Sequence, residues 1–170
     1  MRANVLTYRL ATRDDLAAVD ALLARSYPQL LAWDYPPSVM VTAVPLLARA
    51  QPGLLGSGTY WLAFDADDRL AGVGGWTRGG PGPMIGGGSR TGHVRHVATG
   101  VDHLRRGVGS GLLLRVLDQA REAGMERMEC LSTRTAVPFY AALGFRALGE
   151  VEVPLRPGIA FPAVAMVRDL

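Results

Sequence analysis

A glycine-rich turn in the second half of the chain has the residue types that bind an anion. Residues 104–111 read Leu-Arg-Arg-Gly-Val-Gly-Ser-Gly. They stand between an expected strand and an expected long helix, where unpaired backbone N–H groups meet the positive end of the helix dipole. Glycine lets an anion approach the backbone closely, and Arg105 and Arg106 could add charge-assisted hydrogen bonds. The turn therefore predicts a site for phosphate or pyrophosphate.

Known phosphate-binding turns make different demands on these positions. A nucleotide P-loop ends in Gly-Lys-Ser or Gly-Lys-Thr, and it is excluded because all 18 basic residues are arginine. A dinucleotide-binding turn needs a third glycine where Leu112 stands, although Glu129 lies near the distance expected for its ribose-binding acid. The glycines could also serve only to close a tight turn over the helix. The last two interpretations stay open on these residues alone.

Other residues near this turn could take part in proton transfer or charge recognition. His93 and His96 lie on one expected strand and titrate in the range that suits a proton acceptor, with His96 favoured. Arg95, between them, is a candidate charge anchor for a substrate or for the fold. Cys130 lies in an alternating apolar segment, which is typical of a core residue rather than a nucleophile. Because it is the only cysteine, no internal disulfide and no cysteine-cluster metal site is predicted.

The first half of the chain predicts helices followed by a hairpin. Thr12 begins a segment with a capping pattern and one apolar face, and Pro45 must kink or divide the second helix. The expected elements are a helix over 12–25, an aromatic turn over 27–37, a helix over 38–50, strands at 60–64 and 70–76, and a Gly/Pro-rich loop over 79–92.

The second half has the clearest periodicity. A helix that follows the glycine turn ends at Gly124, and a short helix is expected over 136–143. The buried stripe of the long helix is predicted to be Val108, Leu112, Leu113, Val116, Leu117 and Ala120. Strands are expected at 93–99, 127–132, 145–153 and 160–168. The order of strand, turn, helix and strand predicts a parallel pair at the centre of a mixed sheet.

Length and composition limit the possible classes of protein. A chain of 170 residues, 49% hydrophobic and 19% charged, predicts a single folded domain over 1–170. No apolar run approaches the roughly 18 residues of a membrane span, and the first residues do not resemble a signal core, so a soluble cytoplasmic protein without membrane contact is expected. A net charge of +3 favours an anionic ligand. The scattered arginines form no basic stripe with interleaved aromatics, which argues against nucleic-acid binding.

The stretch over 95–145 resembles the GCN5-related N-acetyltransferase (GNAT) superfamily. The resemblance rests on the strand residues Val97-Ala98-Thr99, on the turn pattern Gln/Arg-x-x-Gly-x-Gly/Ala, and on a Tyr followed by Leu-Gly-Phe in residues 139–145. It implies an α/β fold: a mixed, mostly antiparallel sheet of six to seven strands with helices on both faces. Two positions depart from the family pattern. Leu104 replaces the first Gln or Arg of the turn, and Thr133 stands where many members have an asparagine.

The resemblance also implies a site for acetyl-coenzyme A. A bulge would splay the strand before the turn from its neighbour, and the thioester would enter the wedge, where Val97 and Thr99 contact it through backbone groups. Tyr140 would protonate the departing thiolate. The implied cofactor-binding residues are Val97, Ala98, Thr99, Arg105, Arg106, Gly107, Val108, Gly109, Ser110, Gly111, Thr133 and Phe139.

The activity implied is acetyl transfer to an amine by direct attack in a ternary complex, without a covalent enzyme intermediate. The N–H of Val97 would stabilise the oxyanion, and His96 or His93 would accept the proton. Residues Trp76 and 33–35 could line the acceptor pocket. Small metabolites, antibiotics, amino acids and protein N-termini are all compatible acceptors, and the acyl group could be longer than acetyl. A catalytically degenerate acyl-coenzyme A sensor is the alternative, and the apolar C-terminal strand makes a homodimer plausible.

Overall fold

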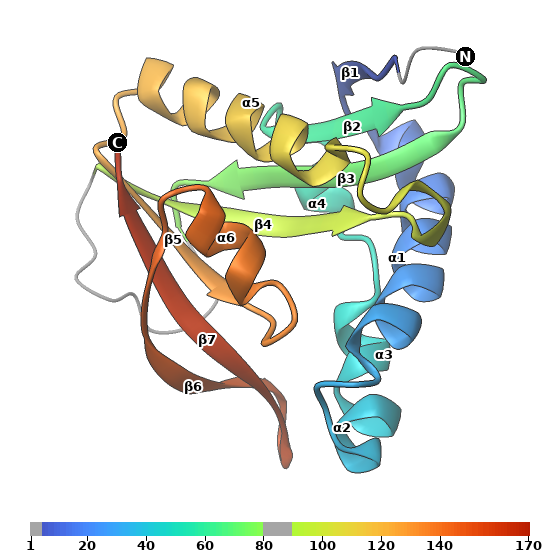
Figure 1. The fold of residues 1–170 in the computed structure, drawn as a ribbon, viewed down its shortest axis with the longest axis vertical. Helices are drawn as coiled ribbons and strands as arrows, with labels where there is room; N and C mark the ends of the chain where they lie inside the picture. Colours follow the sequence, from blue (N-terminus) through green and yellow to red (C-terminus); the bar gives the residue numbers. More distant parts are fainter. Residues whose placement is uncertain (1–4, 80–89) are drawn as a thin grey trace.

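The computed structural model describes residues 5–79 and 90–170. These residues form a mixed sheet of seven strands with helices packed on it (Figure 1). Its strand order is β1-β2-β3-β4-β5-β7-β6. The strands are β1 (Thr7–Leu10), β2 (Tyr60–Phe64), β3 (Leu70–Thr77), β4 (Thr91–Thr99), β5 (Arg127–Ser132), β6 (Arg146–Arg156) and β7 (Ile159–Asp169). All neighbours are antiparallel except β4 and β5, which are parallel. The expected α/β fold, with a parallel pair at the centre of a mixed sheet, is confirmed.

Helices cover both faces of this sheet because successive strand residues point to opposite sides. On β2, Leu62 packs with Val19 and Leu23 on one face, whereas Ala63 packs with Leu112 on the other. The first face carries α1 (Leu16–Leu31), preceded by a 3₁₀ turn (Arg13–Asp15) and followed by α2 (Pro37–Thr42), α3 (Val44–Leu47) and α4 (Pro52–Leu55). The second carries α5 (Val108–Glu122) and α6 (Val137–Ala142), and the 3₁₀ turn η2 (Val101–His103) precedes α5 (Figure 1).

The periodic second half folds as its pattern predicts. All six residues of the expected stripe on α5 are buried, and Gly124 adopts the left-handed conformation (φ +87°) that ends this helix. The expected bounds of β5 agree with the structure. β6 begins one residue later and ends three residues later than predicted, and β7 is one residue longer at each end. β7 lies between β5 and β6, so the sheet pairs it on both sides. Phe161, Ala163, Ala165, Met166 and Val167 of β7 are buried within the chain, which accounts for its apolar sequence.

The first half differs from its prediction in two helices, α1 and α4. The sequence predicts a turn from Tyr27, but α1 continues through Pro28 to Leu31. Proline removes one backbone hydrogen bond from a helix interior. Here the apolar residues Val19, Leu23 and Leu31 are buried on α1, and this packing outweighs the lost bond. Pro45 divides the second predicted helix into α2 and α3, as expected, whereas α4 is not foreseen.

Residues 80–89 of the expected Gly/Pro-rich loop lie outside the described residues, and β4 begins at Thr91, two positions earlier than predicted. None of the helices within residues 5–79 and 90–170 is long and apolar enough to cross a lipid bilayer.

Candidate functional site

A cavity opens where the two parallel strands separate. β4 and β5 pair only at Thr91–Arg127, Gly92–Met128 and His93–Glu129, after which neither strand pairs with the other. The space between them is part of a cavity of about 520 Å³. Its walls come from β4, the N-terminus of α5, the β5–α6 segment, α1, α3 and the β6–β7 hairpin. The site therefore lies between elements that are far apart in the sequence.

A β-bulge shapes the wall formed by β4. In the register with β3, Val73 faces Ala98 and Gly75 faces Arg95, so His96 and Val97 together oppose the single residue Gly74. A bulge bends its strand and changes the direction of its side chains. His96 adopts a positive φ of +47°, which is uncommon for a residue with a side chain. The bulge predicted for this strand is present, at the level where β4 has left β5.

The N-terminus of α5 forms one end of the cavity. Gly107 precedes it in the left-handed conformation (φ +76°), and no side chain caps the helix. The N–H of Gly111 donates to the carbonyl oxygen of Gly107 at 3.0 Å, the first bond of the helix. The amides of the three residues between them have no carbonyl partner within the helix. A helix end of this kind attracts anionic groups such as phosphate.

Gly109 lines the cavity beside Phe139 and Thr99. A Cβ built on it would lie 3.1 Å from Cε2 of Phe139 and 3.5 Å from Oγ1 of Thr99, two residues that also line the cavity. Any side chain at this position would therefore narrow the passage between α5, α6 and β4. Arg105 also lines the cavity and adopts a positive φ of +61°.

The structure brings most of the predicted site residues to this one cavity. Its lining includes His93, His96, Val97, Ala98, Thr99, Arg105, Gly107, Val108, Gly109, Ser110, Thr133, Phe139 and Tyr140. Arg106 and Gly111 are not part of that lining. A Cβ on Gly111 would meet the hydroxyl of Tyr8, so close packing against β1 accounts for this glycine.

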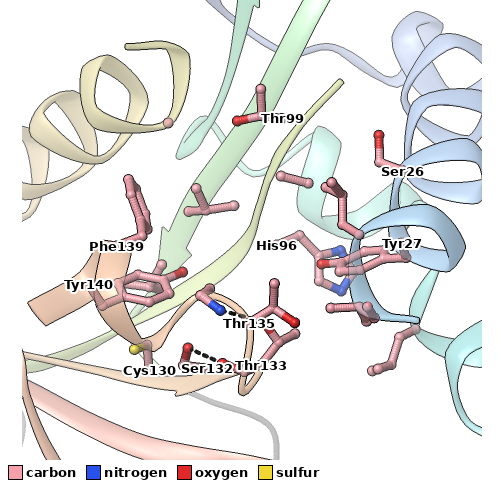
Figure 2. Close-up of a pocket in the computed structure, with 18 of the residues that line it drawn as sticks. Ser26, Tyr27, His96, Thr99, Cys130, Ser132, Thr133, Thr135, Phe139 and Tyr140 are labelled. Carbon is pink, nitrogen blue, oxygen red and sulfur yellow. Dashed lines mark hydrogen bonds between the residues drawn. The ribbon is translucent and has the colours of Figure 1, made fainter. Parts of the chain in front are cut away.

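Tyr140 presents its hydroxyl to the cavity from α6. Figure 2 shows Tyr140 and Phe139 on one side, with His96 and Tyr27 across from them. The Tyr140 ring packs edge-on against Phe139 and Phe145, with centroids 5.1 and 5.4 Å away. Burial raises the pKa of Tyr140 well above its ordinary value, so the phenol stays protonated at neutral pH. Below it, burial also raises the pKa of Cys130, and this thiol remains neutral.

His96 lies in the cavity as an uncharged ring. Burial, with a smaller contribution from the nearby Arg95 guanidinium, lowers the pKa of His96 to about 4. Its Nδ1 is buried and has no hydrogen-bond partner among the described residues. Burial likewise raises the pKa of Tyr27, on α1, to about 12. Both groups are therefore neutral at pH 7.

His93 is held differently, at the point where the strands part. Its Nε2 lies 3.1 Å from Oε2 of Glu129, and the two residues are only 4% and 2% exposed. Burial lowers the pKa of His93, against the opposing influence of Glu129. A neutral His93 donates its Nε2–H to the carboxylate. Nε of Arg127 lies 3.7 Å from the other oxygen of Glu129.

Thr133 is hydrogen-bonded to the turn that precedes α6, the helix that carries Tyr140. Its Oγ1 accepts a hydrogen bond of 3.1 Å from the N–H of Ala136, and its carbonyl oxygen accepts one of 2.7 Å from the hydroxyl of Ser132 (Figure 2). The Thr133 hydroxyl proton is still free to serve a ligand. A threonine in place of an asparagine thus supports the turn before α6 and keeps one donor at the cavity.

The far part of the cavity is apolar and differs from the sequence prediction. Its wall comprises Leu30, Leu31, Leu46, Leu47, Val153 and Leu155. Trp76 and residues 33–35, expected at an acceptor pocket, are absent from the lining. Trp76 is buried under α5, where its Nε1–H donates to Oε1 of Gln119 at 3.0 Å, and Trp33 is 94% exposed. The hydroxyl of Tyr35 donates to the carbonyl oxygen of Pro162 at 2.8 Å and accepts from the N–H of Arg134.

One signal in the sequence could have located this wall. The apolar period that begins at Leu16 continues through Tyr27, Leu30 and Leu31, and it indicates that the helix runs past Pro28.

The fold and the cavity together define an α/β protein whose central parallel strands open beside an uncapped helix N-terminus. A model of the acetyltransferase (GNAT) family matches residues 22–145. The chain belongs to this family, which confirms the resemblance found in the sequence. No curated protein sequence matches the chain.

Solved structures with the same fold span the whole chain. A GCN5-related N-acetyltransferase from Rhodopseudomonas palustris is 21% identical, with a TM-score of 0.77 over 100% of this chain and 98% of that one. The PaiA N-acetyltransferase from Thermoplasma acidophilum, crystallised with coenzyme A, is 13% identical, with a TM-score of 0.73 over 98% and 99% of the two chains. A GCN5-related N-acetyltransferase from Kribbella flavida is 22% identical, with a TM-score of 0.63 over 97% and 98%. At these identities the likeness shows the fold.

Proposed function

We propose that this protein transfers the acetyl group of acetyl-coenzyme A to the nitrogen of an amine, by direct attack in a ternary complex. The observation that carries the proposal is the separation of β4 from β5 beside the uncapped end of α5. A thioester ligand with a long arm and a diphosphate needs both features at once, a slot and an anion site. Family membership and the coenzyme A bound to a structural neighbour support the same donor.

The diphosphate would lie at the turn before α5. The amides of Val108, Gly109 and Ser110 offer donors without helical partners, and Gly109 lets phosphate oxygens come close to the backbone. Arg105 adds a positive charge at the same end of the cavity. The arm would then extend between β4 and β5, past the backbone of residues 97–99 and the hydroxyl of Thr133.

The reacting carbonyl would lie at the bulge. There the N–H of Val97, a residue of the bulge, would stabilise the negative charge that develops on the thioester oxygen. Tyr140 faces the same space from the opposite wall with a protonated hydroxyl (Figure 2). We assign Tyr140 to the leaving sulfur, which needs a proton or a strong hydrogen-bond donor as it departs.

The amine must lose a proton, because an alkylammonium is not nucleophilic. Nδ1 has no partner among the described residues in either His93 or His96. We assign proton acceptance to His96, because it lies at the bulge, whereas His93 lies where β4 and β5 still pair and its Nε2 is engaged with Glu129. The low pKa keeps His96 unprotonated at pH 7, so the ring can accept the proton of the amine. Because the ring is a weak base, it then releases that proton to water.

The direct test is to incubate the protein with acetyl-coenzyme A and a broad panel of amines. Free thiol is followed by a colorimetric reagent and acetylated products by mass spectrometry. The proposal predicts amine-dependent thiol release matched by N-acetylated product. Tight binding of acetyl-coenzyme A without any turnover across the panel would contradict it.

A further inference from the structure

Arg95 presents a positive charge to the cavity without an anionic partner. The residue is on β4 next to the bulge, is partly buried and lines the cavity. Its guanidinium donates to Oε1 of Gln51 at 3.1 Å and to Oγ1 of Thr77 at 3.4 Å, both neutral acceptors. Within the described residues no carboxylate pairs with it, in contrast to Arg9, which Asp15 pairs at 2.8 Å.

A buried or partly buried cation without a counter-ion is unfavourable unless a ligand supplies the negative charge. An arginine has five N–H donors in a planar fork that fits a carboxylate. The hydrogen bonds to Gln51 and Thr77 use two of them and fix the direction of the side chain. The remaining donors are available to a ligand.

The other residues that line the cavity limit the chemical class of that ligand. The described lining contains no aspartate or glutamate, so a second ammonium group on the acceptor would find no counter-charge there. The leucine and valine side chains that line the same cavity as Arg95 favour a ligand with an apolar body. Polyamines and basic peptides are therefore poor candidates for the acceptor that binds in this cavity.

We propose that Arg95 binds a carboxylate of the acceptor, and that the acceptor is an amino acid with an apolar side chain. The inference rests on the proposed acetyl transfer. Arg95 immediately precedes His96 and Val97, the two residues of the bulge. A carboxylate held by this side chain places an amino group a few bonds away next to the bulge. The apolar side chain then faces the leucine wall.

L-Leucine and L-leucinamide are the probes, because they differ only in the carboxylate. kcat/KM is measured for both with the wild type, Arg95→Gln, Arg95→Lys and Arg121→Gln. For each protein, kcat/KM for leucine is divided by kcat/KM for leucinamide, and this ratio is compared between the proteins. The comparison cancels the different basicity of the two amines. Arg121 pairs with Asp118 on the exposed side of α5 and is the matched control.

Arg95→Gln is expected to lower the leucine-to-leucinamide ratio about 30-fold, the effect of losing one charged, hydrogen-bonded pair. Arg95→Lys should keep part of the preference, since it retains the charge but not the fork. Gln51→Glu should also lower the ratio by giving Arg95 an internal carboxylate, and it leaves Arg95 in place. Arg121→Gln should leave the ratio unchanged.

A second readout does not depend on turnover. With coenzyme A present, N-acetyl-L-leucine should bind at least about tenfold more tightly than its amide, by titration calorimetry. Equal ratios in the wild type and Arg95→Gln, or no carboxylate-dependent binding, would overturn the inference. Failure of acetyl transfer itself would be visible separately, as the absence of acetyl-coenzyme A binding or of thiol release with every amine.

Discussion

His93 and Glu129 are the last residues that β4 and β5 pair, and their side chains are hydrogen-bonded to each other. Nε2 of His93 lies 3.1 Å from Oε2 of Glu129 in a place almost closed to solvent. Beyond this pair the two strands diverge into the cavity. The pair therefore marks the point at which the sheet opens.

The first prediction concerns the strength of this junction. Glu129→Leu removes the acceptor for a buried Nε2–H and should lower the free energy of unfolding by about 1–3 kcal/mol. Glu129→Gln keeps a carbonyl acceptor and should lose less. Urea denaturation at pH 7 measures both. Glu126→Leu, which breaks an exposed pair with Arg90, is the control and should change stability by less than about 0.5 kcal/mol. Equal losses for Glu129→Leu and the control would show that the pair has no structural role.

The second prediction concerns Gly109. Gly109→Val places a branched side chain at the opening, where even a Cβ lies 3.1 Å from Phe139. The dissociation constant for acetyl-coenzyme A should rise at least about tenfold, with little change in thermal stability. Titration calorimetry gives the constant. Gly53→Val is the matched control, since no atom lies within 4 Å of a Cβ on Gly53. An unchanged constant in Gly109→Val would remove the phosphate site from this turn.

The third prediction separates catalysis from binding at Tyr140. Tyr140→Phe removes only the hydroxyl and keeps the ring packed between Phe139 and Phe145. If the hydroxyl serves the leaving sulfur, kcat should fall about 100-fold while affinity for acetyl-coenzyme A changes little. Tyr8→Phe removes a hydroxyl outside the cavity and should leave kcat unchanged. Parallel losses of kcat and affinity in Tyr140→Phe would indicate a packing role instead.

The fourth prediction follows from the buried, neutral ring of His96. Its pKa is about 4 in the folded protein and ordinarily 6.5, so the unfolded chain binds a proton that the folded chain does not between these pH values. Stability is therefore fully present above pH 6.5 and falls as the pH drops towards 4, by roughly 2–3 kcal/mol from this group.

His96→Asn should remove that part of the pH dependence. Asparagine tolerates the positive φ at this position, so the bulge is retained. Free energies of unfolding at pH 7 and pH 4.5 should differ less in the variant than in the wild type. Parallel pH profiles for the two proteins would show that His96 is not buried in its neutral form.

The sequence predicts those helices and strands that are determined by interactions between residues close together in the chain. Leu112, Leu113 and Val116 recur at the helical period, and Gly124 ends the helix with a conformation that glycine adopts readily, so α5 is evident in the sequence. The end of α1 is harder to predict. Pro28 is unfavourable in a helix by itself, and only the packing of Leu31 against distant residues such as Phe161 makes the longer helix stable.

The same distinction applies to the candidate site. Gly109 and Gly111 are equivalent in a turn pattern, but in the fold Gly109 faces the cavity and Gly111 faces Tyr8, which lies about a hundred residues earlier. Trp76 is also indistinguishable in sequence from a pocket residue. Its hydrogen bond to Gln119 exists only once α5 packs on β3. The glycine-rich turn over 104–111 predicts the anion site beside the open end of the sheet. The apolar wall formed by α1, α3 and the β6–β7 hairpin depends on tertiary contacts, which the sequence pattern does not reveal.

The central claim is that acetyl-coenzyme A enters between β4 and β5 with its diphosphate at the N-terminus of α5. A crystal structure of the protein soaked with coenzyme A tests it most directly. We expect diphosphate oxygens within hydrogen-bonding distance of the amides of Val108, Gly109 and Ser110, and the sulfur beside Tyr140. Coenzyme A bound elsewhere, or β4 and β5 paired along their full length with side chains filling the end of α5, would contradict the account.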